Sequence, residues 1–378
     1  MTGDGEMRRT LVIMLVGLLL LYLAPGGLCQ GCVASFSSGQ VALHILAQQA
    51  SCSDPRCVSA NGSTINLVRL LEQKFKAELQ NIAIHGNPLT NFYQLSLDVL
   101  ALCQLNGRLS PASTSALLSP GHKKYYLGGQ FSVDTAAVAI LAHICLQTRG
   151  QPLPPKVYKK IRQNVQWLVD KILAEKRRDG EIGNIYSTGL AMQALSVSSS
   201  YQKPGAWNCL QTLHRVLDKI PQGTFKNPMA ASQVLSSLEN RTYLDVSRLN
   251  CSMDPDNLPL STARPTSPTS RLPSIRVTYT VADGVNNTFN DSISVTVTQG
   301  SIFFKVMEVT QDKDPSKFSF TYTQSSWGPY ITSVQGLQAD NNHRTYWQLL
   351  SNGIPLSQGA GDYVVSNSER LEVKFTVY

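Results

Sequence analysis

The sequence has no cysteine after Ser252, few charged residues (15%), and no long apolar run after its first 23 residues. The last absence argues against a membrane span in the body of the chain, because a spanning helix needs about 20 apolar residues in a row. Because no cysteine follows Ser252, all disulfides must lie before that residue. We also find no pattern typical of a nucleophile–base pair or a metal cluster.

Lysine and arginine (33) exceed aspartate and glutamate (25), which gives a formal net charge of +8. The cations gather only in Lys156–Arg162 and Lys171–Arg178, where they alternate with apolar residues at helical spacing. This pattern indicates a solvated helix face and not a nucleic-acid-binding surface.

The first 30 residues resemble a secretory signal peptide. Arg8 and Arg9 precede the apolar run Leu11–Leu23, and a small-residue stretch follows, so we expect cleavage within Pro25–Gln30. The mature protein should be secreted and soluble. Five Asn-x-Ser/Thr sequons then predict exposed, glycosylated surface; they begin at Asn61, Asn240, Asn250, Asn286 and Asn290.

Eight cysteines fit an oxidising compartment: Cys29, Cys32, Cys52, Cys57, Cys103, Cys145, Cys209 and Cys251. Cys29 and Cys32 have the spacing of a metal or redox motif. They lie at the signal-peptide boundary without a second ligand pair, so we do not expect zinc there.

Residues 254–274 form the boundary between two patterns. This stretch holds five prolines with repeated serine and threonine, and it predicts an extended linker. Residues 31–253 before it have helical periodicity, and residues 275–378 after it alternate like strands. We therefore expect two domains on a tether, with a ligand site formed by both.

Five short segments before the linker are almost wholly apolar after a polar start, which is typical of buried helices. They are Ser38–Ala47, Tyr93–Leu102, Val133–Ala142, Tyr186–Leu195 and Met229–Leu238, with starts 55, 40, 53 and 43 residues apart. Amphipathic stretches alternate with them: Ile65–Leu79, Lys156–Lys176 and Trp207–Ile220. This repeat predicts an α/α toroid of helical hairpins.

Such a barrel gathers the inner helix N-termini at one rim. The polar residues there would be Gln40, Gln94, Asp134, Asn184 with Tyr186, and Ser232 with Gln233. Each alone could be a helix cap or a satisfied core group. Together they favour a polar ligand surface.

After the linker the chain predicts a small α+β, β-rich domain. Strands are expected at Ile275–Thr280, Ser292–Thr298, Phe318–Tyr322 and Leu371–Val377, and a helix at Ser301–Val309. Trp327, Tyr330, Tyr346 and Trp347 flank Gly and Pro turns. They could be the core of the domain, or a flat wall for a planar, amide-bearing ligand.

Several of these stretches together resemble the cobalamin-carrier family of intrinsic factor, haptocorrin and transcobalamin, over nearly everything after Ser37. The resemblance is carried by SGQVAL (38–43), PLTNFYQLSLDVLALC (88–103), FSVDTAAVA (131–139), IGNIYSTGLAMQAL (182–195), NPMAASQVL (227–235), TYLDV (242–246), SWGPYITSVQGL (326–337), RTYWQLLS (344–351) and PLSQGAGDYVV (355–365). Three of them, FYQLSLDVLALC, SWGPYITSVQGL and SQGAG, look most like haptocorrin.

The resemblance implies a non-enzymatic carrier that clamps cobalamin or another corrinoid between its two domains. The implied ligand residues of the helical domain are Gln40, Thr90, Gln94, Asp134, Asn184, Tyr186 and Gln233. Those of the second domain are Ser326, Trp327, Gly328, Pro329, Tyr330, Ile331, Trp347, Gln348, Leu349, Leu350, Ser351, Asn352, Gly353, Ile354, Pro355 and Leu356. It also implies a cell-surface uptake receptor and a monomer.

The family match further suggests the disulfides Cys103–Cys145, Cys52–Cys251 and Cys32–Cys209, with Cys57 free. Transcobalamin-like carriers present a histidine just before the VDT-type segment, but residues 127–132 here contain none. His122 lies farther upstream, and His143 is more typical of a buried core residue. We therefore expect no protein ligand to cobalt. Compared with the family, one inner helix is missing before Ser38, so the ring would be incomplete.

Three alternatives remain open at this point. One is an α/α-barrel glycoside-processing enzyme, which would need two converging carboxylates, and Asp134 and Asp98 are the acids available on the inner helices. Another is a purely structural glycoprotein. Within the family, the chain could also be intrinsic-factor-like and not haptocorrin-like.

Overall fold

The computed structural model describes residues 36–60, 63–127, 129–148, 152–225, 228–249, 273–325, 328–356 and 358–377. The predicted signal peptide, residues 254–272 of the predicted linker, Cys29, Cys32 and Cys251 lie outside these ranges. The chain divides into two compact units, Met1–Met253 and Asp254–Tyr378.

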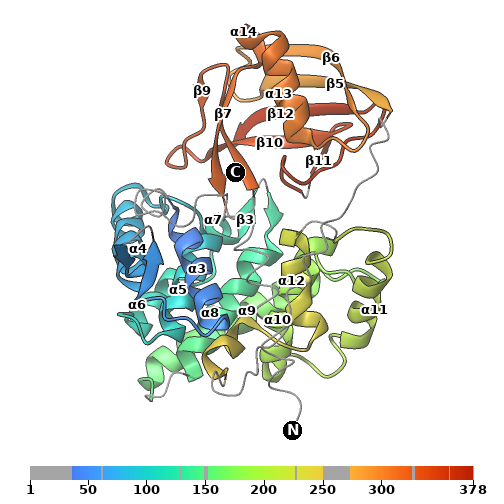
Figure 1. Ribbon diagram of the computed structural model, residues 1–378. Helices are drawn as coiled ribbons and strands as arrows, with labels where there is room; N and C mark the ends of the chain where they lie inside the picture. Colours follow the sequence, from blue (N-terminus) through green and yellow to red (C-terminus); the bar gives the residue numbers. More distant parts are fainter. Residues whose placement is uncertain are drawn as a thin grey trace. The chain divides into compact units, whose positions relative to one another are not determined.

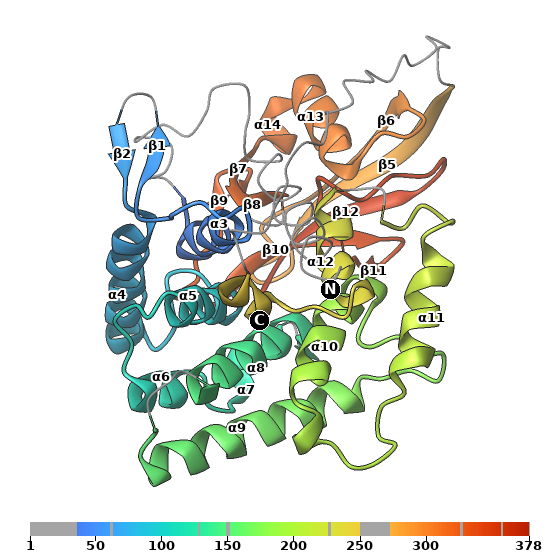
Figure 2. The ribbon, with the colours of Figure 1, turned by 60° about the horizontal axis from the view of Figure 1, so that its bottom comes forward.

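The first unit is a helical array whose inner layer follows the predicted segments. The inner helices are α3 (Ser38–Ala50), α5 (Phe92–Gln104), α8 (Val133–Thr148), α10 (Ile185–Val197) and α12 (Pro228–Leu238), and each packs along the next (Figure 2). Their nearly uniform apolar character explains the burial: thirteen of the sixteen residues of α8 are buried. Among the described residues the inner helices number five, as predicted.

The outer layer is amphipathic. It consists of α4 (Leu67–His85), α6 (Pro111–Leu117), α9 (Pro155–Ala174) and α11 (Cys209–Lys219). On α9 the stripe Ile161, Val165, Leu168 and Ile172 is fully buried, while the lysines lie on the solvent side. The cationic run at 156–162 is therefore a helix face, as the spacing predicts.

Short elements complete this unit. They are the hairpin β1–β2 (Val58–Ala60, Ser63–Ile65), the hairpin β3–β4 (Tyr126–Leu127, Gln130–Phe131), α7 (His122–Tyr125), η1 (Ser199–Tyr201) and η2 (Tyr243–Arg248). The last of these, η2, packs on α3, α5 and α8. Gln104 Nε2 donates to the Tyr243 carbonyl (2.9 Å), and the Tyr243 amide donates to Gln193 Oε1 (3.0 Å). These bonds lie at the C-terminal parts of α5 and α10.

Two close contacts and a disulfide show that neighbouring inner helices run parallel. A Cβ on Gly39, at the start of α3, would lie 2.7 Å from the Gln94 side chain at the start of α5. A Cβ on Gly183, just before α10, would lie 2.8 Å from Val133 at the start of α8. The predicted Cys103–Cys145 disulfide joins the C-terminal parts of α5 and α8. The N-termini therefore share one rim.

The second unit is built on a five-stranded sheet in the order β11-β10-β12-β5-β6 (Figure 1). The strands are β5 (Ser274–Asp283), β6 (Asn290–Thr298), β10 (Thr345–Ser351), β11 (Ile354–Pro355) and β12 (Arg370–Val377). All pairs are antiparallel except β12 with β5, where Val373 pairs with Val281. Alternating burial along β5 (Val277, Tyr279 and Val281 inward) produces the predicted period of two.

Helix α13 (Phe303–Lys313) packs against β5 and β6, and it buries Phe303, Val306 and Met307. A separate three-stranded sheet contains β7 (Phe320–Ser325), β8 (Gly328–Val334) and β9 (Leu337–Gln338). The strand predicted at Phe318–Tyr322 begins two residues later, because Pro315–Phe318 forms the short helix α14 with Asp314 as its N-cap. The two aromatic segments, expected as turns, are instead largely the strands β8 and β10.

Candidate functional site

The rim of the helical unit carries its most ordered polar group at the start of α10. Asn184 is the N-cap, and its Oδ1 accepts hydrogen bonds from the amides of Tyr186 and Ser187, both at 2.9 Å. Because the oxygen is engaged, the side-chain nitrogen is the group that can donate to a ligand. The Tyr186 ring packs edge-on against Phe225 at 6.2 Å.

Asp134, in the first turn of α8, is the neighbouring rim acid. Its Oδ2 accepts a hydrogen bond from Ser187 Oγ (2.9 Å), whereas its Oδ1 is buried without a partner among the described residues. Burial raises the pKa of Asp134 to about 6, although the Ser187 hydrogen bond acts in the opposite direction. A buried acceptor of this kind is incomplete by itself; Asp134 as a whole is only half-buried, so an N–H of a ligand at the rim is a candidate partner.

Gln94 lies at the start of α5 and faces α3. Its side-chain Oε1 accepts a hydrogen bond from the backbone amide of Gly39 at 3.2 Å. The backbone amide of Gln94 donates to Asn91 Oδ1, the N-cap of α5, at 2.9 Å. As at Asn184, the carbonyl oxygen is used internally and the Nε2 group is left to donate. The rim thus combines two amide donors, whose oxygens accept first-turn helix amides, with one carboxylate acceptor that is held by Ser187.

Thr90 is positioned by a buried acid that the sequence analysis did not select. Glu78, on the outer helix α4, is only 2% exposed. It accepts hydrogen bonds from Thr90 Oγ1 (2.8 Å), the Thr90 amide (3.1 Å) and Ser38 Oγ (2.9 Å). A signal was present in the sequence, because Glu78 continues the apolar stripe Leu71–Phe75 at helical spacing.

Asp98 lies deeper, on α5, and is fully buried. The pKa of Asp98 is raised well above its ordinary value, mainly because the side chain is buried and secondly because the Glu78 carboxylate lies nearby. No surface group of a ligand could reach a side chain with no exposed area. Asp98 is therefore a structural acid and not a second rim carboxylate.

Two predicted ligand residues are less accessible than expected. Gln40 is 3% exposed, and its Oε1 accepts the Ser37 amide (2.7 Å) in a capping box at the start of α3. Gln233 is 5% exposed where α12 approaches α10. Gln40 therefore caps α3 in this structure, and its role in binding stays a prediction.

In the β-rich unit, the exposed part of the predicted ligand surface is the β10–β11 turn. Asn352 and Gly353 both have positive φ (50° and 80°), which is typical of a type I′ hairpin turn. Asn352, Gly353, Ile354 and Pro355 are exposed, Ile354 to 69%. Tyr330, on β8, is 41% exposed. These residues can offer apolar surface and backbone groups to a flat ligand.

Other predicted residues of this unit belong to its core. Ile331 (4% exposed), Trp347 (5%) and Leu350 (8%) are buried, and Trp347 stacks on Phe289 at 6.4 Å. The side chains of Ile331 and Trp347 pack into the core of the unit, whereas Leu350, three positions after Trp347, is buried on the other face of β10. That these residues cover a ligand stays a prediction, and in this structure their side chains are buried within the unit. Pro329, Gln348, Leu349 and Leu356 are half-buried, Ser351 is buried, and Gly328 begins β8. Ser326 and Trp327 lie outside the described residues.

The histidine of α8 is a core residue, as predicted. His143 is fully buried, with Nε2 3.4 Å from the Leu118 carbonyl oxygen, and burial lowers its pKa to about 4. Within the described part of the chain, no group of three or more His, Cys, Asp or Glu residues could hold a metal ion.

Two cysteines of the helical unit carry free thiols. Cys57 is exposed and free, as predicted. Cys209 is also exposed and free at the start of α11, which differs from the predicted Cys32–Cys209 pairing. Its predicted partner Cys32, and the predicted partner Cys251 of Cys52, fall outside the described residues.

None of the described helices is long and apolar enough to span a membrane.

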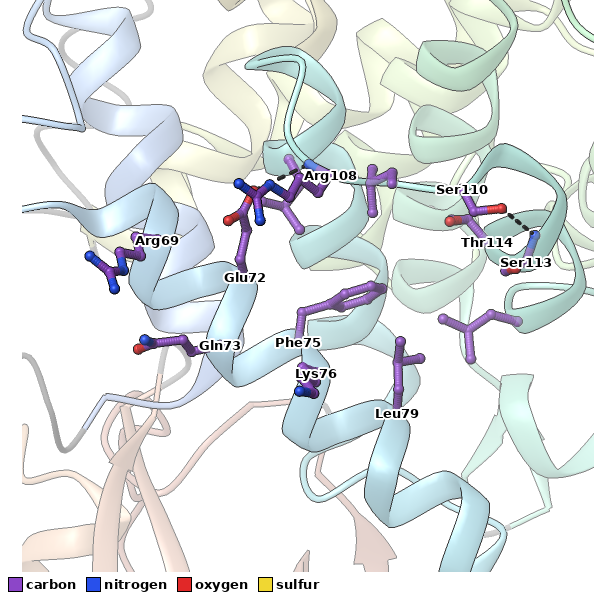
Figure 3. A pocket seen from close by; sticks show the side chains of 13 residues that line it. Arg69, Glu72, Gln73, Phe75, Lys76, Leu79, Arg108, Ser110, Ser113 and Thr114 are labelled. Carbon is purple, nitrogen blue, oxygen red and sulfur yellow. Dashed lines mark hydrogen bonds between the residues drawn. The ribbon is translucent and has the colours of Figure 1, made fainter.

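A groove of about 530 Å³ lies elsewhere, along the outer helices α4 and α6 (Figure 3). Phe75 and Leu79 point into it, whereas Arg69 and Gln73 point away. At its edge Glu72 Oε1 accepts the Arg108 amide at 3.2 Å. None of the predicted ligand residues lines it, and its cationic side chains Arg69, Lys76 and Arg108 are exposed. It lacks the buried, unsatisfied polar group that marks the rim.

Comparisons with known proteins agree with this geometry. A family model for eukaryotic cobalamin-binding proteins matches residues 24–271, and a model of a domain of unknown function matches residues 300–377. Human transcobalamin-1 is 47% identical over 357 residues, covering 92% of this chain and 80% of the relative. Mouse cobalamin binding intrinsic factor is 37% identical, covering 91% and 80%.

A solved structure of haptocorrin in complex with Cbi aligns with a TM-score of 0.78 and 42% identity, covering 100% of this chain and 93% of that chain. The similarity extends over both the helical unit and the β-rich unit. The chain therefore belongs to the family of eukaryotic cobalamin-binding proteins.

Proposed function

We propose that this chain is an extracellular, non-enzymatic carrier that binds cobalamin and related corrinoids. The observation that carries the proposal is the rim of the helical unit, where Asp134 keeps an unsatisfied, buried acceptor and is linked through Ser187 to the oriented amide of Asn184, with the oriented amide of Gln94 at the start of α5. A corrinoid has peripheral carboxamides that supply N–H donors and carbonyl acceptors. These groups match one rim acceptor and two rim donors.

The β-rich unit has a different contribution in this proposal. Its exposed turn at Asn352–Pro355 and the Tyr330 ring offer apolar area and backbone polar groups. We propose that tight retention needs both units, since two linked sets of contacts bind more tightly than either set alone. The related haptocorrin, which was solved with Cbi (cobinamide), supports a corrinoid as the ligand class.

Cobalt is expected to receive no ligand from the protein. The sequence of residues 127–132, just before α8, contains no histidine, and His143 is enclosed in the core. Bound aquocobalamin should therefore keep an exchangeable water, and its absorption spectrum should lack the signature of a histidine-ligated corrinoid. The secreted location rests on the signal-peptide-like residues 1–30.

A glycoside-processing enzyme is disfavoured by one specific observation. Such chemistry needs two carboxyl groups that flank the scissile bond. Asp134 is available at the rim, but Asp98 is fully buried against Glu78 and cannot meet a sugar. Binding therefore explains the rim better than hydrolysis does.

The test uses the purified full chain and measures retention of aquocobalamin and cobinamide through gel filtration by visible absorbance. The informative variant is Asn184→Ala, and its matched control is Asn208→Ala. Both remove an N-cap side chain, but Asn208 caps the outer helix α11 and is not one of the predicted ligand residues. We expect Asn184→Ala to lose ligand at least about tenfold faster than Asn208→Ala. A wild-type chain that retains neither corrinoid would refute the proposal.

A further inference from the structure

The second half of the motif PLSQGAGDYVV (355–365) belongs to no predicted ligand surface, yet it contacts two segments that do. Residues Gly359–Tyr363 form a tight turn in which the amides of Asp362 and Tyr363 both donate to the Gly359 carbonyl at 3.1 Å. The first two amides of α13 donate to this turn, Phe303 to Tyr363 and Phe304 to Ala360, both at 2.8 Å. The turn is thus fixed to the helix that covers the sheet.

On one side the turn touches the start of β8. A Cβ on Gly361 would lie 2.8 Å from Pro329 Cδ and 3.3 Å from its Cγ. Such a contact leaves no room for any side chain at position 361. Because the turn is held by α13, the pyrrolidine ring of Pro329 rests on a fixed backbone. Tyr330, the exposed aromatic of the predicted ligand surface, follows it directly.

On the other side the turn is linked to the β10–β11 hairpin by a buried acid. Glu369 is 5% exposed, and its Oε1 accepts hydrogen bonds from both Tyr363 Oη and Ser351 Oγ. Its Oε2 accepts the Ser366 amide at 2.6 Å. Ser351 is the last residue of β10, immediately before the exposed turn at Asn352.

The hairpin turn has a second anchor on the same stretch of chain. The Asn352 amide donates to the Arg370 carbonyl (2.7 Å), and the Arg370 amide donates to Asn352 Oδ1 (3.2 Å). Glu369 and Arg370 therefore fix the two residues that begin the turn. A buried carboxylate with three partners is costly to place unless its geometry is well defined, which argues for a specific role.

We propose that Gly361 and Glu369 are positioning residues for the corrinoid: the Gly359–Tyr363 turn holds the start of β8 and the β10–β11 hairpin in one fixed arrangement, so that Tyr330 and Asn352–Ile354 meet the ligand together. This inference rests on the proposed function and deepens it. Neither residue touches the ligand, and both act through their contacts with Pro329 and Ser351.

The first experiment compares Glu369→Gln with Glu308→Gln in the full chain. Glutamine keeps the size of Glu369 but has one acceptor oxygen, so it cannot serve Ser351, Tyr363 and Ser366 together. Glu308 lies on α13 of the same unit in an exposed pair with Lys305 and serves as the control. We expect cobinamide to dissociate about tenfold faster from Glu369→Gln, and the control to match the wild type.

A double-mutant cycle separates positioning from a general loss of stability. Glu369→Gln is combined with Ile354→Ala, which trims the exposed tip of the hairpin. If Glu369 acts by placing that tip, the two effects on the dissociation rate will be non-additive, because a displaced Ile354 has little left to lose. A purely structural role would leave them additive, and that result would overturn the inference.

Gly361→Ala gives an independent route if Glu369→Gln folds poorly. Its new methyl group meets Pro329, so it should speed dissociation, and adding Pro329→Ala should recover part of the loss by removing the colliding ring atoms. Absence of any coupling between these two substitutions would contradict the contact.

The outcomes separate the two proposals. A wild-type chain that does not retain cobinamide overturns both the proposed function and the positioning role of Gly361 and Glu369. Retention by wild type with unchanged rates in Glu369→Gln and Gly361→Ala overturns the positioning role alone.

Discussion

The helical unit and the β-rich unit hold their candidate ligand groups by opposite means. On the helical rim the groups are side chains, and backbone amides at helix N-termini orient them, as the Tyr186 and Ser187 amides orient Asn184. In the β-rich unit the groups lie on backbone turns, and a side chain orients them, as Glu369 orients Ser351.

This difference affects how each surface can be recognised. A helix N-cap is local, so its residue types and spacing can be read from a few consecutive positions. A turn fixed by a carboxylate 18 residues away along the chain depends on sheet pairing. The difference also predicts which substitutions change stability and which change binding alone.

The largest effect should come from the closest approach within the helical unit. A Cβ on Gly189 would lie 2.5 Å from the Gln233 carbonyl oxygen of α12. Gly189→Ala should destabilise this unit by about 3 kcal/mol, because the neighbour is backbone and cannot swing aside. Urea unfolding of this variant can be compared with Gly121→Ala, where the nearest atoms lie at 3.7 Å. Unchanged or increased stability, as helix propensity alone predicts, would contradict the close packing.

The next effect concerns Asp134 and depends on pH. Its pKa is raised to about 6 in the folded protein, so the unfolded chain loses its proton first as pH rises from about 4 to about 6. Over that window the stability of the wild type should fall, and above it the ionised carboxylate costs about 2 to 3 kcal/mol. Asp134→Asn removes this cost, so the variant should be more stable at pH 8 and equal near pH 4, which urea unfolding at the two pH values would measure.

Binding should change in the other direction for the same variant. The carboxylate Oδ1 is the proposed acceptor for a corrinoid amide, and a charge-assisted hydrogen bond is stronger than a neutral one. We expect Asp134→Asn to bind cobinamide about tenfold more weakly at pH 8 while unfolding at a higher temperature. A variant that loses both stability and affinity would indicate a structural role for Asp134.

A smaller effect is expected at the hairpin turn of the β-rich unit. Gly353 has φ of 80°, and Gly353→Ala forces an alanine into the left-handed region at a cost of about 1 kcal/mol. Thermal unfolding followed by tryptophan fluorescence, which reports Trp347 in this core, measures the change. No shift would mean that the turn can relax without straining the sheet.

The smallest effect on stability belongs to Ile354→Ala. Ile354 is 69% exposed in the described structure, so its truncation should alter the free energy of unfolding by less than about 0.5 kcal/mol. If it contacts the corrinoid, ligand release should nevertheless accelerate. An Ile354→Ala chain with wild-type release would remove this residue from the ligand surface.

Elements that depend on local pattern could be predicted from the amino-acid sequence. The five apolar segments fall in α3, α5, α8, α10 and α12, and the amphipathic stretches overlap α4, α9 and α11, because burial on all sides or on one side is encoded in residue spacing. The alternating strands β5, β6 and β12 followed from a period of two. The rim residues Asn184 and Gln94 could be selected because capping is local.

Which of the selected residues can meet a ligand depends on contacts that form only in the folded chain. Trp347 and Ile331 occupy inward strand positions, which depend on the register of β10 with β12 and of β8 with β7. Glu78 and Glu369 reach Thr90 and Ser351 across elements that pair or pack only after folding. At Asp134 the carboxylate Oδ2 accepts a hydrogen bond from Ser187, 53 residues later, and the other oxygen, Oδ1, is buried without a partner among the described residues. Long-range hydrogen bonds of this kind leave no periodic trace along the chain, whereas burial and capping do.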